Sequence, residues 1–333
     1  MQRRETRSSF RPRALSVVAA LGLAASACAS DDRPFLLPAD VVQAAPATTS
    51  TIPPPSTTLD PGTPLALLTP TGVVVPILDI TPTAYLVQSP CQAEVEIVYG
   101  TPIYQVDIVL DPGHGGEVET GAVGPNGLTE KDLNLRLAKL AARKLEARGI
   151  SVALTRTADY RLPIQTRSQI ADTLKAQALI SIHHNAPVLT ASSEPGSEVF
   201  YQSRSLQSAR LGGLVQEEIL DALRQFDGIN WVAARDAGVV AVLKPDGTES
   251  YGMIRRPDTP AVLAEFGYIA NQSEADLFDT PEYLDAAAEA ITAAAERYLT
   301  TDDTGVAPNP VNRTFTPTGG TGGVDNCEDP ALE

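Results

Sequence analysis

The sequence predicts an α/β fold: a single domain with a mostly parallel, twisted sheet flanked by helices on both faces, preceded by a small β appendage. From about residue 106 to 299, short apolar runs alternate with longer segments whose apolar residues recur at helical spacing. This alternation is typical of parallel sheets, whose strands are connected through helices. Of the 333 residues, 43% are apolar, which is enough to bury a core of this kind.

Each element follows from its local pattern. Apolar runs predict strands at 106–110, 151–155, 178–183, 198–201, 239–243 and 261–266. Helical spacing predicts helices at 130–148, 163–177, 205–226 and 281–299. Upstream, residues 64–105 form the β appendage, with a hairpin over 67–78 and further strands at 85–87 and 94–99. The main domain is therefore expected to span 106–300.

Both ends of the chain differ in composition from this domain. Residues 1–27, a basic region followed by a short apolar segment, are typical of an export signal. Their end resembles a bacterial lipoprotein signal, although Ala25 stands where Leu is usual; in such a signal Cys28 becomes lipidated and anchors the chain to the outer face of the cytoplasmic membrane. Residues 28–63 are rich in Pro, Thr and Ser and predict an extended tether. Residues 301–333 predict a flexible tail.

Charge and cysteine content limit the partners and the compartment. The net charge of −16 argues against nucleic-acid binding, which depends on Lys and Arg. If Cys28 is lipidated, Cys91 and Cys327 remain. An oxidising exterior favours a disulfide between them, and the alternative is two free thiols. We therefore expect an exported protein of the cell envelope, with a monomer as the default oligomeric state.

The histidines point to a catalytic site. The chain has three, and they stand at the ends of two predicted strands: His114 after the first, His183 and His184 after the third. Glu130 and Glu265 are expected at the same sheet edge, where open α/β folds place their sites. Two histidines and one glutamate, with a fourth position open, are typical of catalytic rather than structural zinc.

Four stretches of the sequence resemble the signature blocks of the zinc-dependent N-acetylmuramoyl-L-alanine amidases, which hydrolyse peptidoglycan. They are 111–116 (Asp-Pro-Gly-His-Gly-Gly), 129–131 (Thr-Glu-Lys), 181–185 (Ser-Ile-His-His-Asn) and 260–271. The resemblance covers about residues 106–299. By position it implies one zinc ion per chain, bound by His114, Glu130 and His183, with Glu265 as the general acid–base. His184 must face the other side of its strand, and is expected to be exposed or to support a ligand.

The resemblance implies hydrolysis of the amide bond between the lactoyl group of N-acetylmuramic acid and L-alanine of the stem peptide. Metal-activated water would attack, and the substrate would be peptidoglycan or a muropeptide. Asn185 is a candidate for orienting substrate or a ligand. Arg255 and Arg256 are candidates for holding stem-peptide carboxylates, although a solvated surface pair explains them equally well.

Two other functions stay open. One is an exported zinc peptidase that cuts within the stem peptide, because zinc chemistry does not fix the bond that is cut. The other is a non-catalytic cell-wall binding or regulatory protein on the same scaffold. Some relatives carry a helix that covers the zinc, inserted after the block that contains His183. Residues 185–195 are too few for such a helix, so we expect an open site.

Overall fold

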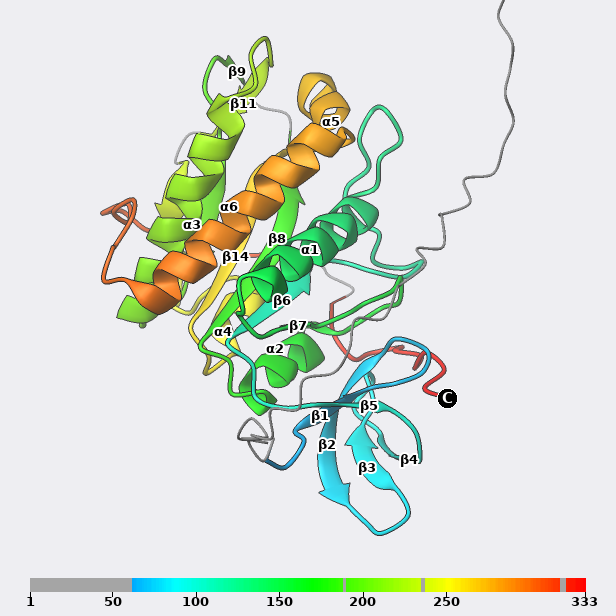
Figure 1. Cartoon of the computed structure of the whole chain (residues 1–333). Helices are drawn as coiled ribbons and strands as arrows, with labels where there is room; N and C mark the ends of the chain where they lie inside the picture. The colour runs from blue at the N-terminus through cyan, green and yellow to red at the C-terminus, as the bar shows by residue number, and fades with distance from the viewer. Residues whose placement is uncertain (1–61, 188–189, 235–236, 318–321) are drawn as a thin grey trace, which may run out of the picture. The chain divides into compact units, whose positions relative to one another are not determined.

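The computed structural model describes residues 62–187, 190–234, 237–317 and 322–333 (Figure 1). The predicted signal at 1–27, Cys28 and almost all of the tether predicted at 28–63 lie outside the described residues. Within the described part, none of the helices is both long enough and apolar enough to cross a membrane.

A mixed sheet forms the centre of the fold. Its strands are β6 (Ile108–Pro112), β7 (Val152–Leu154), β8 (Ala178–Asn185), β10 (Glu198–Tyr201), β12 (Gly238–Val240) and β14 (Ala261–Tyr268). Among the described residues these six strands lie in the order β12-β10-β14-β8-β6-β7. The β10–β14 pair is antiparallel and the other neighbours are parallel. The prediction of a mostly parallel sheet is therefore confirmed.

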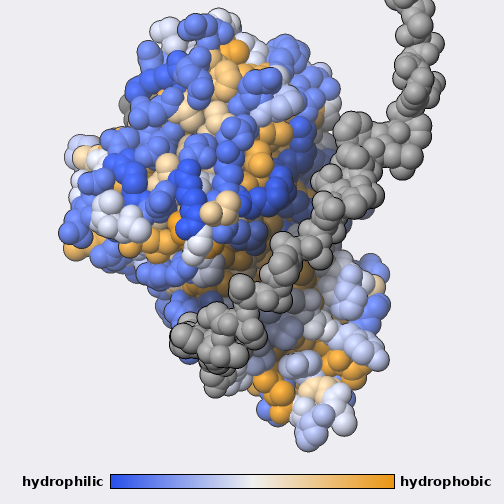
Figure 2. Space-filling view, viewed as in Figure 1, coloured by the Kyte–Doolittle hydropathy of each residue, from blue (hydrophilic) through white to orange (hydrophobic). Residues whose placement is uncertain are grey.

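Helices cover both faces of this sheet (Figure 1). One face carries α1 (Glu130–Ala147), α3 (Leu206–Arg224) and α6 (Pro281–Thr300), and the other carries α2 (Ile164–Thr173) and α4 (Gly252–Arg255). Successive strand residues face opposite sides, so β14 places Val262 in the first core and Leu263 in the second. Hydrophilic side chains predominate on the outer surface of the first helical layer (Figure 2).

The β appendage is a separate five-stranded sheet within residues 66–103, in the order β4-β3-β2-β1-β5. Its strands are β1 (Ala66–Leu68), β2 (Val74–Ile80), β3 (Tyr85–Gln88), β4 (Glu94–Ile97) and β5 (Thr101–Ile103). Residues such as Leu67 and Val75 are buried in the same apolar cluster as Ile170 and Leu174, on or beside α2. The appendage therefore packs on the α2 side of the domain. Apolar side chains such as Leu78 and Ile80 remain exposed on it.

The prediction of a flexible tail at 301–333 is wrong for those residues of this range that the structure describes. Residues Arg313–Thr314 form β15, which pairs with β13 (Val242–Leu243). Further along, Cys327 forms a disulfide with Cys91, so of the two alternatives for these cysteines the structure has the bridge. The composition predicted flexibility because this segment has no apolar residues at a regular spacing. Its contacts come instead from side chains such as Arg210 and Arg161, which donate hydrogen bonds to its backbone carbonyls.

Some shorter elements also differ from the prediction. The strand predicted at 239–243 is split into β12 and β13, and the helix predicted at 163–177 ends at Thr173. The sequence pattern did not predict β5, α4, α5 (Gln272–Phe278) or the pair β9 (Thr190–Ser192) and β11 (Trp231–Ala233). These elements are three to seven residues long, too short for a periodic pattern to develop.

Candidate metal centre and active site

The site forms where β6, β8 and β14 end. After β6, Gly113 donates its N–H to the carbonyl of Ile182, which keeps the departing loop against β8. A Cβ on Gly113 would lie 2.2 Å from Cε1 of His183, so only glycine lets this imidazole approach the backbone so closely. His114 itself adopts φ 63°, in the left-handed region, which turns its side chain back toward His183.

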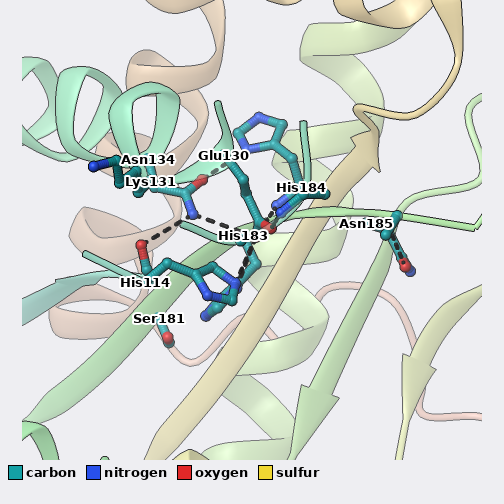
Figure 3. A network of polar contacts seen from close by, with 12 residues as sticks. His114, Glu130, Lys131, Asn134, Ser181, His183, His184 and Asn185 are labelled. Atoms are coloured by element: carbon teal, nitrogen blue, oxygen red, sulfur yellow. Dashed lines mark hydrogen bonds and ion pairs between the residues drawn. The ribbon is translucent and has the colours of Figure 1, made fainter. Parts of the chain in front are cut away.

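His114, Glu130 and His183 lie together at this edge (Figure 3). Glu130 Oε1 is 3.2 Å from His114 Nε2 and 3.0 Å from His183 Nδ1. One ligand atom from each residue can be chosen so that all lie within 4.8 Å of one another. The sequence predicted this trio, and the structure brings it together as a group that could bind a metal ion.

Glu130 is placed by the first turn of α1. Its Oε2 accepts a hydrogen bond from the N–H of Ala122, and its Oε1 accepts one from the N–H of His184. Burial alone would raise the pKa of this carboxyl. The hydrogen bonds from His114 and His183 hold the pKa well below its usual value. Glu130 is therefore a buried carboxylate anion. Burial also lowers the pKa of His183, which favours its neutral, metal-binding form.

His184 points to the opposite face of β8, as side-chain alternation predicts. It is buried, so of the two placements that the sequence left open the exposed one is wrong. Its Nδ1 is 2.8 Å from Asn134 Oδ1, and its Nε2 is 2.6 Å from the Tyr283 hydroxyl. Burial lowers the pKa of His184 to about 3, so the ring is neutral. A neutral ring donates to Asn134 and accepts from Tyr283, and thereby fixes β8 between α1 and α6.

Glu265 lies in register with His183 on the neighbouring strand, and both side chains project to the α2 side of the sheet. Within the described part of the chain, its Oε2 atom is buried and has no hydrogen-bond partner. Burial raises the pKa of Glu265 well above its usual value, and the nearby carboxylates of Glu130 and Glu198 raise it further. A buried, unpaired carboxyl beside a cluster of metal-binding groups is typical of a proton-transfer residue.

A buried ion pair supports the loop that carries His114. Asp111 and Arg167 are almost fully buried and 2.7 Å apart. Burial opposes ionisation of Asp111, but Arg167 and two hydroxyl donors hold its pKa below the usual value. The Arg167 guanidinium also donates to the carbonyls of Pro112 and His114. This one side chain therefore joins α2 to the end of β6 and to the loop.

The cluster opens into a cavity of about 340 Å³. It is lined by Asp111, Gly113, His114, Glu119, Ile164, Arg167, His183, Tyr251, Gly252, Met253, Leu263, Glu265 and Gly322. Sequence reasoning missed Tyr251 and Met253, in a segment without a periodic pattern, and Gly322, in the supposed tail. In residues 185–187 and 190–195, which the structure describes, there is no helix that could cover the site, as expected.

Three proposed substrate-binding residues do not line the cavity. The Asn185 side chain accepts a hydrogen bond from the N–H of Ala186 and points away from the cluster (Figure 3). Arg255 donates to the carbonyls of Glu249 and Ser250, which ties down its own helix. Arg256 is exposed. The structure therefore gives these side chains local contacts and does not bring them to the candidate site.

A sequence model described as N-acetylmuramoyl-L-alanine amidase matches residues 108–297. The chain belongs to this family. Its members are hydrolases that act on peptidoglycan, so the predictions of the family and of an enzyme are confirmed.

Individual relatives are similar to part of this chain. The uncharacterized protein YqiI of Bacillus subtilis is 34% identical over 215 residues, which are 64% of this chain and 92% of YqiI. The amidase LytC of the same organism is also 34% identical, over 57% of this chain but only 35% of LytC. The solved N-acetylmuramoyl-L-alanine amidase of Clostridium difficile 630 is 28% identical with a TM-score of 0.50, over 60% of this chain and all of that one. In all three, part of this chain lies outside the match.

Proposed function

We propose that the protein is a zinc-dependent amidase that cleaves between the lactoyl group of N-acetylmuramic acid and L-alanine of the peptidoglycan stem peptide. The observation that carries the proposal is the convergence of His114, Glu130 and His183 beside a carboxyl, Glu265, whose Oε2 is buried and unbonded. The ligand set supports a metal-dependent enzyme, and the family supports the identity of the bond that is cleaved.

The residues fit a zinc ion on chemical grounds. Two imidazole nitrogens and one carboxylate oxygen are a ligand set that catalytic zinc sites use. The carboxylates of Glu130 and Glu265 repel each other across the site, and a divalent cation would offset that repulsion. Gly113 has no Cβ atom, and this leaves room for the His183 ring. We therefore assign His114, Glu130 and His183 as ligands of one zinc ion per chain.

When bound, zinc supplies a Lewis acid that polarises the scissile carbonyl and makes water a better nucleophile at neutral pH. Glu265 takes a proton from the attacking water and passes it to the leaving amide nitrogen. Its lack of a hydrogen-bond partner leaves Oε2 available for this transfer. His184, through Asn134 and its own backbone N–H, keeps Glu130 in place, and Tyr251 and Met253 form apolar walls of the cavity.

The surroundings of the site support export. The Cys91–Cys327 disulfide suits an oxidising compartment, and the substrate lies outside the cytoplasmic membrane. We propose cleavage of residues 1–27 and an envelope location, with Cys28 as a lipid anchor and residues 28–63 as its tether. A monomer remains the expected state. We propose that the appendage spans residues 64–105 and that the catalytic domain spans residues 106–300.

Metal binding and turnover in two variants test the assignment. His183→Ala should lose both bound zinc and muropeptide cleavage. Glu265→Gln should keep about one zinc per chain and lose cleavage by about 100-fold or more, because general acid–base catalysis contributes roughly that much. Zinc content is measured by mass spectrometry of the dialysed proteins. Full zinc in His183→Ala, or full activity in Glu265→Gln, would remove the residue roles assigned here.

A further inference from the structure

The segment after α6 lies beyond the residues that the family model matches, yet it reaches the edge of the central sheet. It runs beside β12 and β13: the N–H of Asn309 donates to Val239, that of Arg313 to Ala241 and that of Phe315 to Leu243. These hydrogen bonds fix the backbone of residues 309–315. They also set the direction in which the Arg313 side chain leaves β15.

A row of functional side chains crosses the sheet at the level of the site. Glu265 is the direct partner of His183 on β8 and of Glu198 on β10. Side chains of directly opposed residues project to the same face, with Cβ atoms roughly 5 Å apart. Two glutamates are therefore neighbours on the α2 side of the sheet. Glu198 is buried, and so is the Oε2 atom of Glu265, so charges on the two groups interact with little screening by water.

The two neighbouring acids differ in their partners. Glu198 Oε1 accepts a hydrogen bond from the Tyr268 hydroxyl at 2.9 Å, and its Oε2 forms an ion pair with Arg313. The Arg313 guanidinium also lies over the Phe200 ring, 5.7 Å from its centre. Glu265 Oε2 has no partner among the described residues. One acid is thus fully occupied, while the other keeps an open oxygen.

We propose that Arg313 is a positioning residue for the reaction, because it binds the Glu198 carboxylate and keeps it from taking the neighbouring Glu265 carboxyl as its hydrogen-bond partner. Without a cation, the buried Glu198 carboxyl would have to find another partner. The neighbouring Glu265 carboxyl is in register to be that partner. A hydrogen bond between the two acids would occupy the oxygen that the proton transfer needs. This inference rests on the proposed role of Glu265.

The test compares steady-state muropeptide cleavage by four variants of the full mature chain. Arg313→Gln should lower kcat about tenfold or more and leave KM within about twofold, since the cavity walls are unchanged. Arg313→Lys keeps the charge and should retain most of kcat. Adding Glu198→Gln to Arg313→Gln should restore kcat, because no buried charge then lacks a cation. Thr314→Ala, an exposed neighbour on β15, is the control and should match the wild type.

Restoration by Glu198→Gln separates positioning from a general structural effect. If Arg313 only holds the segment to the sheet, the double variant will be as impaired as Arg313→Gln, and the inference is overturned. An Arg313→Gln enzyme with kcat within about twofold of the wild type also overturns it. Should Arg313→Gln fail to fold, the decision passes to Arg313→Lys and the double variant: a low kcat in either one refutes the inference. An inactive wild type would instead refute the proposed function.

Discussion

Replacing Arg167 with methionine is expected to weaken both the fold and the metal centre. Arg167 pairs with Asp111 at 2.7 Å, and both side chains are at most 3% exposed. Breaking a buried pair by removing one partner costs about 3–5 kcal/mol, because the remaining charge stays buried without compensation. Methionine fills most of the space but also leaves the carbonyls of Pro112 and His114 without this donor. We therefore expect a loss of about 4 kcal/mol of unfolding free energy.

That loss is a large part of the roughly 5–15 kcal/mol that stabilises a typical domain, and corresponds to a drop of about 10 °C in Tm. It is measured by urea unfolding at neutral pH. Arg148→Met is the matched control: Arg148 bonds Glu289 and Glu296 at the surface, and exposed pairs contribute under about 1 kcal/mol. Zinc affinity should also fall in Arg167→Met, since the His114 loop loses its anchor.

Asp111→Asn provides the second half of this test. Added to Arg167→Met, it removes the buried charge and should recover part of the lost stability, while hydrogen bonds to Thr155 and Ser181 remain available to the amide. Equal costs for Arg167→Met and Arg148→Met would refute the reasoning. So would a double variant less stable than Arg167→Met alone, because the cost would then not come from an uncompensated charge.

Three further predictions concern separate features. Gly113→Ala should reduce zinc affinity at least about tenfold by displacing the His183 ring, as measured by competition with a chelator; unchanged affinity would contradict the close approach seen here. Burial raises the pKa of Glu274 to about 7, so the folded state holds an extra proton between the unfolded pKa and pH 7. The free energy of unfolding should therefore fall by about 3 kcal/mol as pH rises over this range. In unfolding experiments, Glu274→Gln should abolish this pH dependence. Replacing Cys91 and Cys327 together by serine should cost up to about 5 kcal/mol, since the bridge closes a loop spanning 236 residues; unchanged Tm would show that the tail's other contacts suffice.

The parts of the fold that the sequence predicted are those with long, repeated patterns. The buried strands β6, β8 and β14 have continuous apolar runs, and α1 and α6 have apolar residues at helical spacing over several turns. The candidate ligands were also predictable, because histidine and glutamate at strand ends carry a specific chemistry. His184 was separable from His183 by strand alternation alone.

The remaining features depend on tertiary contacts that leave no local pattern. The segment after residue 300 has the composition of a flexible tail, yet Arg210, Arg161 and a disulfide hold it. Arg255 and Arg256 matched the pattern of a carboxylate clamp, but α4, which ends at Arg255, turns the Arg255 side chain to backbone carbonyls. The pairing of Glu198 with Arg313 joins residues 115 positions apart, a separation that no periodicity encodes.

The most direct test of the proposed function is the mass of the products from one defined muropeptide. The mature chain should release the intact stem peptide, with a free amino group on L-alanine, together with the intact sugar. Chelation or Glu265→Gln should abolish this release. Cleavage within the peptide would keep the metal centre but contradict the assigned bond. An intact muropeptide, from a chain that holds zinc, would contradict the assignment of this protein as an active amidase.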